Sequence, residues 1–186
     1  MNGREDLKQY LLGGGAGAMV GGGLLSVLGV FFLIGGIQEA GNSLAPIAVG
    51  IALIVGGILI ICGRLKKQRS FDELLASLEA QGKLEGILRE FGGASQMFKD
   101  SMRLGETMIF PKHQGEMIPY GEIAQAYQYI HKTNYVEDSR ALRIRLRSGK
   151  VKDIAKLRLR GKDDETLKQV LIFMLTKNSS IKIGYK

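Results

Sequence analysis

The sequence predicts a two-helix transmembrane hairpin followed by an α+β domain on the cytoplasmic side of a membrane. Three observations lead to this prediction. Two long runs in the first third of the 186-residue chain contain no charged residue. A cluster of Lys and Arg directly follows the second run. The remaining sequence shows alternating apolar patterns that are typical of strands and a late amphipathic pattern that is typical of a helix.

The first uncharged run extends over 30 positions, from Gln9 to Gln38. A bilayer core about 30 Å thick is crossed by roughly 20 helical residues, so the run is longer than one span requires. The three glycines at 13–15 are poor helix formers, and we therefore place the first span at about 15–37. The run also exceeds the apolar length of a signal peptide, so we expect it to be retained.

The second uncharged run extends over 24 positions, from Ala40 to Gly63. Its length matches one helical span closely, and we place this span at about 43–63. Residues 38–42 are too few for anything but a hairpin turn. Neither span contains Asp, Glu, Lys, Arg or His. Because such residues usually mark an ion or proton path, their absence from the sequence of the spans argues against a transporter.

Lys and Arg near the spans predict the orientation of the hairpin. The N-terminal tail contains Arg4 and Lys8, the connection at 38–42 contains neither residue type, and 64–69 contains four basic residues. The positive-inside rule then predicts a two-pass protein of the cell membrane with both termini in the cytoplasm. The predicted parts are a tail and hairpin at 1–63, a basic juxtamembrane segment and helical linker at 64–93, and a cytoplasmic domain at 94–186.

Glycines recur within the two spans at a spacing of seven residues. Small residues at this spacing let two helix backbones approach closely, with a crossing angle of about +20°. We favour packing of the two spans within one hairpin, and the alternative is a homo-oligomer that encloses a pore. The glycines concerned are Gly15, Gly22, Gly29, Gly36, Gly50 and Gly57.

A helical linker is predicted after the second span. Ser70 and Glu73 have the spacing of a capping box, which predicts a helix that begins at residue 71. Apolar residues then follow at helical spacing as far as Phe91, and Gly82 interrupts them. We therefore expect one broken helix or two short helices between 71 and 91. Their apolar face can pack on the following domain, which we favour, or lie on the membrane surface.

The C-terminal half of the chain is predicted to contain about five strands, a late helix and a last strand. Its clearest alternation is at 141–147, where apolar residues and arginines take opposite faces of a strand. Ser148 and Gly149 predict a turn, after which 151–155 returns as the second strand of a hairpin. Apolar residues at helical spacing between 167 and 175 predict the buried stripe of the late helix.

The predicted hairpin is strongly basic. Residues 64–186 contain 24 basic and 15 acidic groups, whereas residues 1–63 contain two and three. An anionic membrane surface attracts nearby Lys and Arg, so one interpretation is a surface that binds anionic lipid headgroups or an acidic partner. The alternative, weighted equally, is a solvated strand face that is basic because an anionic membrane is near. The candidate binding residues are Arg143, Arg145, Arg147, Lys150 and Lys152.

Other functions are disfavoured by the residues that the sequence contains. Nucleic-acid binding ranks lower because exposed aromatic residues do not alternate with the arginines of this strand. Enzymatic chemistry is also disfavoured, since the chain has one cysteine, Cys62, and two histidines, His113 and His131, in separate segments. It shows no metal-ligand spacing, nucleophile elbow or phosphate-binding loop. We therefore expect no catalytic residues, no metal and no cofactor.

Two motifs resemble those of a known domain family. Ile-Pro-Tyr-Gly-Glu-Ile at 118–123 and Leu-x-Ile-x-Leu-x-Ser-Gly-Lys at 142–150 precede the late helix. In this order they resemble bacterial pleckstrin-homology-like (PH-like) domains, many of which are attached to one or two membrane helices. The resemblance implies a PH-like β-barrel or half-barrel with a late amphipathic helix. The chain departs from that fold in its strand count, because PH domains have seven strands before the helix.

The resemblance implies a binding or scaffold module rather than an enzyme. Together with the membrane hairpin, it leads us to expect a membrane-anchored module that presents a basic domain to the membrane surface or to a protein partner. The alternative expectation is a glycine-packed oligomeric channel or membrane effector that its cytoplasmic domain regulates.

Overall fold

The computed structural model describes the chain except for residues 1–2, 14–15, 39–43, 135, 160–161 and 186. It divides into two compact units. The hairpin unit is Gly14–Ala80, and the sheet unit combines Met1–Gly13 with Gln81–Lys186. The structure therefore divides the chain differently from our prediction, because the N-terminal tail belongs to the sheet unit and not to the membrane hairpin.

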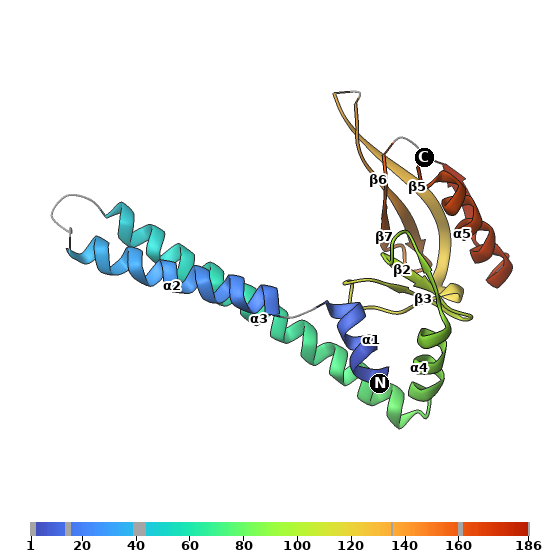
Figure 1. Ribbon diagram of the computed structural model, residues 1–186, viewed down its shortest axis with the longest axis horizontal. Helices are drawn as coiled ribbons and strands as arrows, with labels where there is room; N and C mark the ends of the chain where they lie inside the picture. Colours follow the sequence, from blue (N-terminus) through green and yellow to red (C-terminus); the bar gives the residue numbers. More distant parts are fainter. Residues whose placement is uncertain (1–2, 14–15, 39–43, 135, 160–161, 186) are drawn as a thin grey trace. The chain divides into compact units, whose positions relative to one another are not determined.

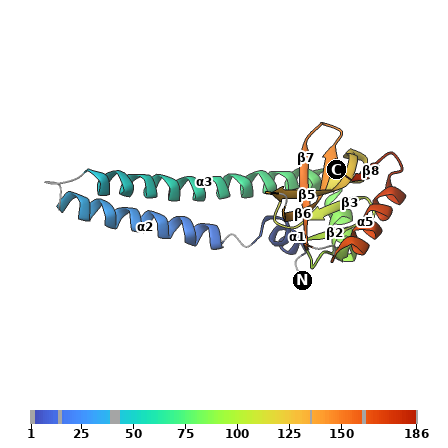
Figure 2. The ribbon, with the colours of Figure 1, turned by 90° about the horizontal axis from the view of Figure 1, so that it is seen from above.

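The hairpin unit consists of two long helices that lie side by side (Figures 1 and 2). Helix α2 is Ala16–Gln38 and helix α3 is Ala45–Ala80, and both are long and apolar enough to cross a membrane. Large apolar side chains point outward from them, including Phe31 at 68% exposure and Leu59 at 66%. A helix pair that exposes so much apolar surface is suited to lipid rather than to water. The predicted turn at 38–42 lies almost wholly outside the described residues.

Glycines form the contact between the two helices. A Cβ atom added at Gly29 would lie 2.7 Å from the carbonyl oxygen of Gly50, and one added at Gly22 would lie 2.9 Å from that of Gly57. A Cβ atom at Gly36 would meet the backbone nitrogen of Ile47 at 3.0 Å. Five of the six predicted packing glycines thus face the other helix of the same hairpin, and the sixth, Gly15, lies outside the described residues.

Helix α3 continues past the end of the uncharged run, through the basic segment, to Ala80. The prediction that a new helix begins after Ser70 is therefore wrong. Residues 64–80 contain no Gly or Pro, so nothing in the backbone interrupts the helix that enters this segment. The interruption comes at Gly82, where φ is +67°, and helix α4 (Leu84–Gly93) follows. The position of this interruption and the helical segment that follows it agree with the sequence pattern.

The N-terminal tail forms helix α1 (Gly3–Leu12), which packs into the sheet unit. Leu7 and Leu11 are fully buried. The ring of Tyr10 contacts that of Phe91 in α4, with centroids 5.3 Å apart. The guanidinium carbon of Arg103 lies 4.5 Å from the centroid of Tyr10 and 4.6 Å from that of Phe91. One cation thus covers two aromatic rings from two different helices.

Backbone hydrogen bonds fix the end of α1. The carbonyl oxygens of Tyr10 and Leu11 accept from the backbone N–H groups of His113 and Gly115, at 3.0 and 2.7 Å. A helix leaves its last carbonyl groups without partners inside the helix, and here a distant loop supplies two of the missing donors. The contact explains why the tail folds with the sheet unit.

Two four-stranded sheets make up the described part of the β structure. The first is antiparallel, in the order β1-β2-β3-β4, and the second has the order β7-β6-β5-β8, in which β8 runs parallel to β5. The strands of the first sheet are β1 (Ser95–Met97), β2 (Met102–Leu104), β3 (Met108–Pro111) and β4 (Ile118–Pro119). Those of the second are β5 (Ile123–Thr133), β6 (Val136–Leu146), β7 (Val151–Leu157) and β8 (Lys182–Tyr185).

The strand count differs from the prediction. In the described residues seven strands precede helix α5 (Asp164–Lys177) and one follows it, whereas the sequence indicated about five and one. The additional strands have two or three residues, too few to show an alternating pattern. The sheets do not close into one barrel. The structure therefore confirms the combination of a helical hairpin with an α+β region, and not a PH-like barrel.

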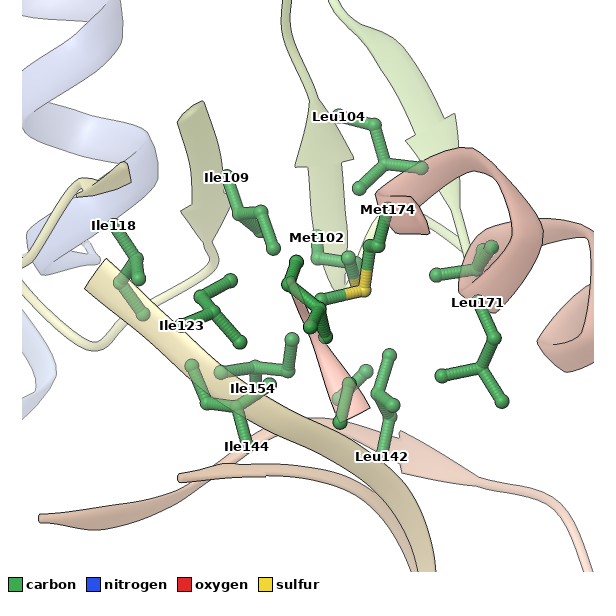
Figure 3. Close-up of a cluster of buried hydrophobic side chains, with 14 of the residues drawn as sticks. Met102, Leu104, Ile109, Ile118, Ile123, Leu142, Ile144, Ile154, Leu171 and Met174 are labelled. Carbon is green, nitrogen blue, oxygen red and sulfur yellow. The ribbon is translucent and has the colours of Figure 1, made fainter. Parts of the chain in front are cut away.

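Both sheets and α5 enclose one apolar core (Figure 3). Leu142 and Ile144 of β6 are fully buried, as the alternating pattern predicted. They meet Met102 of the first sheet and Met174 of α5. Helix α4 is joined to the first sheet by Glu90, whose carboxylate accepts hydrogen bonds from the backbone N–H groups at 107 and 108, at 2.6 and 3.0 Å.

Gly29→Ala should destabilise the hairpin by about 1–3 kcal/mol, because the new methyl group overpacks the helix contact. Gly35→Ala is the matched control, since a Cβ atom at Gly35 meets no atom within 4 Å. The midpoint temperature of thermal unfolding, measured on the full chain in detergent, should therefore be lowered by the first change and hardly affected by the second. Equal effects of the two substitutions would show that the glycine contact does not stabilise the hairpin.

Tyr10→Ala should lower the free energy of unfolding of the sheet unit by about 3 kcal/mol, because it removes a buried aromatic ring. Gln9→Ala, at an exposed position of the same helix, should change it by less than about 0.5 kcal/mol. Urea unfolding of the full chain in detergent measures both values. If Tyr10→Ala proves as mild as the control, α1 is not an integral part of the sheet unit.

Candidate functional site

An open groove of about 700 Å³ lies beside the edge strand β7 of the second sheet. Its lining includes five consecutive residues of that strand, Asp153–Leu157. The loop residues 112–114 also line it, as do Tyr129 of β5 and Ser139 of β6. Its volume falls within the range of ligand-binding clefts, and its lining combines apolar surface with a few polar groups.

The loop after β3 is fixed along β7 by two contacts. The side-chain amide of Gln114 donates to the carbonyl oxygen of Asp153 at 2.7 Å. Lys152 forms an ion pair with Glu116, and partial burial lowers the pKa of the Lys152 ammonium group below its usual value. These contacts hold the loop against the first half of β7 and position it beside the groove.

Lys112, another lining residue, is held by a carboxylate. Its ammonium group donates to Asp100 at 2.9 Å, and Arg103 donates to the same carboxylate at 3.3 Å. Partial burial opposes ionisation of Asp100, but the hydrogen bonds from Lys112 and Arg103 outweigh it and hold the pKa below its usual value. This contact connects the groove to the cation that covers Tyr10 and Phe91.

Both acidic side chains that line the groove have hydrogen-bond partners within the fold. Asp153 accepts two hydrogen bonds from Arg143, at 2.5 and 2.9 Å, and the Arg143 guanidinium lies 3.4 Å from the ring centroid of Tyr129. The Asp153 hydrogen bond raises the pKa of Arg143. Asp138 accepts from the Thr133 hydroxyl at 2.6 Å and contacts His131, and these contacts lower its pKa.

The two cationic side chains that β6 and β7 contribute to the lining differ in their surroundings. Arg140 is 7% exposed, and its Nε and Nη2 atoms lie near Glu137 and Asp164, at 3.1 and 2.7 Å. Its Nη1 atom has no hydrogen-bond partner among the described residues, but it is buried. Lys156 is exposed and lines the groove, and no contact of its ammonium group is found in the described part of the chain. A ligand in the groove can therefore reach the unpaired charge of Lys156.

The five predicted binding residues have different surroundings. Arg143 and Lys152 are in the ion pairs described above, and Arg147 donates to the Gly121 carbonyl at 2.7 Å and to the Ser180 hydroxyl at 2.6 Å. Arg145 and Lys150 are exposed, and neither has a partner in the described ranges. Only Arg145 and Lys150 therefore fit the interpretation of one continuous basic face. The side chains of the other three residues form contacts within the fold.

Sequence reasoning missed the groove itself. Arg140 and Lys156 were recognisable as members of a basic hairpin, but the residues at 112–114 that complete the lining are separated from them by 26 to 44 positions in the chain. The register of β6 and β7 and the course of the β3–β4 loop bring them together. Over the described residues, no group of three or more His, Cys, Asp or Glu side chains could hold a metal ion.

Arg143→Gln should destabilise the sheet unit by about 1–2 kcal/mol, because it removes the contact with the Tyr129 ring and leaves Asp153 without its cation. Arg145→Gln removes the same charge from the same strand at an exposed position, and should cost less than about 0.5 kcal/mol. Thermal unfolding of the two variants at neutral pH compares these effects. Equal losses would indicate that both arginines are solvated surface groups.

The chain matches no protein-family model, no curated protein and no solved structure.

Proposed function

We propose that this protein is a two-pass membrane protein whose sheet unit is a binding module on the cytoplasmic face. The observation that carries the proposal is the position of α1. Helix α1 precedes the first candidate span, yet it folds with the residues that follow the second span. A single folded unit lies on one side of a membrane, so both ends of the hairpin open toward the same side.

The distribution of basic residues supports the cytoplasmic side. Arg4 and Lys8 lie on α1, and four further basic residues lie at 64–69 of α3. The connection between the spans, at 38–44, contains no Lys or Arg. By the positive-inside rule, the two ends joined to the sheet unit lie in the cytoplasm, and the connection lies outside.

The groove supports binding of a partner in preference to broad attraction to lipid headgroups. Three of the five residues expected to attract anionic lipid are in contacts within the fold, whereas the groove retains the exposed Lys156, whose ammonium group has no partner among the described residues. The seven strands that precede α5 in the described residues support the resemblance to PH-like domains, and the parallel strand β8 departs from that pattern. A protein partner that engages the groove is therefore the leading proposal.

The channel alternative has less support. It needs the glycine faces at an interface between copies of the chain, but Gly22, Gly29, Gly50 and Gly57 already contact the other helix of their own hairpin. A pore would have to be built from the outward faces of α2 and α3, which carry large apolar side chains.

Site-specific photo-crosslinking in native membranes tests the proposal. The photoreactive residue p-benzoylphenylalanine is placed at Ser139, which is exposed and lines the groove, in the full-length chain. The matched control carries it at Gln169, an exposed position on α5 that does not line the groove. We expect a discrete protein adduct at position 139 that is absent at position 169.

The other outcomes contradict the proposal in different ways. Adducts with lipid alone at position 139 would assign the groove to the membrane surface. Identical products at both positions, or no product at either, would mean that the groove is not a partner-binding site.

A further inference from the structure

Strand β7 offers hydrogen-bonding groups on one side of the groove. It is the edge strand of its sheet, with β6 as its neighbour on one side. An edge strand presents backbone N–H and C=O groups that no other strand pairs with. The carbonyl oxygen of Asp153 already accepts a hydrogen bond from outside the sheet, from the side-chain amide of Gln114 at 2.7 Å. One backbone group of this edge is thus already hydrogen-bonded within the chain. The edge continues through residues 154–157, which also line the groove.

The length of this edge suits a short extended segment. Five consecutive residues of β7 line the groove, which corresponds to about 17 Å at roughly 3.3 Å per residue. The groove also has apolar surface that can receive a side chain of such a segment, from Leu159. Leu159 is 40% exposed, so a ligand can reach it.

The charge of the lining selects the sign of the ligand. Asp153 is paired with Arg143, and Arg140 lies beside Glu137 and Asp164, so these charges are compensated within the fold. Asp138 lies on β6, one strand further from the edge. Lys156 lies on β7 itself, is exposed, and has no partner for its ammonium group among the described residues. A carboxylate opposite Lys156 on an added strand would form a favourable cross-strand pair.

We propose that the groove binds an extended acidic peptide segment, which adds to the second sheet as a strand beside β7. Backbone hydrogen bonds to 154–157 hold the segment, and a carboxylate of the segment is drawn to Lys156. Strand addition to a sheet edge is an established mode of peptide recognition, in which alternate side chains give specificity. This inference rests on the proposed function, because it names the chemistry of the partner that the binding module takes.

Fluorescence anisotropy with defined peptides tests the inference. The full-length protein is placed in phosphatidylcholine nanodiscs, so that no anionic lipid competes for the groove. The probe is a labelled seven-residue peptide of alternating valine and glutamate, and its control has lysine in place of each glutamate. We expect the glutamate peptide to bind, and the lysine peptide to bind at least about tenfold more weakly.

Two variants of the protein locate the site. Lys156→Glu should weaken binding of the glutamate peptide by about tenfold, since it reverses a free charge in the groove. Lys150→Glu makes the same charge change at an exposed residue outside the groove lining, and should change the affinity by less than about twofold. Both positions are exposed, so thermal unfolding should show that both variants fold.

Backbone methylation tests the strand pairing itself. Two versions of the glutamate peptide are methylated at alternate amide nitrogens, in the two possible phases. A strand presents successive N–H groups to opposite sides, so one phase should abolish binding and the other should be tolerated. Equal effects of the two phases would exclude strand addition. Equally tight binding of glutarate, a small dicarboxylate, would assign the groove to small anions instead.

Failure of this inference can be distinguished from failure of the proposed function. If neither peptide binds at about 1 mM, or if Lys156→Glu has no effect, the acidic-strand inference is wrong. A discrete adduct at position 139 in native membranes would still support a binding module whose partner has a different chemistry.

Discussion

The sheet unit depends on the docking of α1, and that docking centres on one cation between two rings. The guanidinium of Arg103 covers Tyr10 of α1 and Phe91 of α4, and Phe91 contacts Phe110 of β3 in turn. Segments from before and after the membrane hairpin therefore share one contact. Because this contact closes a loop of about 80 residues, the two ends of the hairpin are held together by the folded unit as well as by their own helix packing.

The same contact continues to the candidate site. Arg103 and Lys112 donate to the same carboxylate of Asp100, and Lys112 lines the groove beside β7. The loop that carries Lys112 also caps the last carbonyl groups of α1. One loop thus has two roles in the sheet unit: it completes the end of a helix and forms part of the groove lining.

The sequence predicted those parts of the fold that a simple physical rule determines. Lipid requires long uncharged helices, and close helix contact requires glycine, so the spans and the packing glycines were recognisable from composition and spacing. The apolar face of β6 that packs into the core was predicted from the alternation of apolar and charged residues, because water and core lie on opposite sides of that strand. Strands of two or three residues were missed, since alternation needs more positions.

The candidate site was less accessible to sequence reasoning, because its residues depend on tertiary contacts. Arg143 and Arg145 have the same place in the alternating pattern, yet one pairs with Asp153 and the other is exposed without a partner in the described part. Only the register between β6 and β7 separates them. The docking of α1 had a visible signal, in the helical spacing of Leu7, Tyr10 and Leu11, but the unusually long uncharged run beside it drew the interpretation toward the membrane.

The unbroken course of α3 has a mechanical consequence. Its 36 residues correspond to a rod of about 54 Å, of which roughly 25 Å follows Gly63, the end of the uncharged run. A continuous α-helix transmits torque, whereas a flexible linker would absorb it. A change in the tilt or rotation of the second candidate span would therefore be transmitted along α3 to Ala80. A movement of Ala80 would likewise be transmitted to the apolar segment of the helix. The helix can act as a lever.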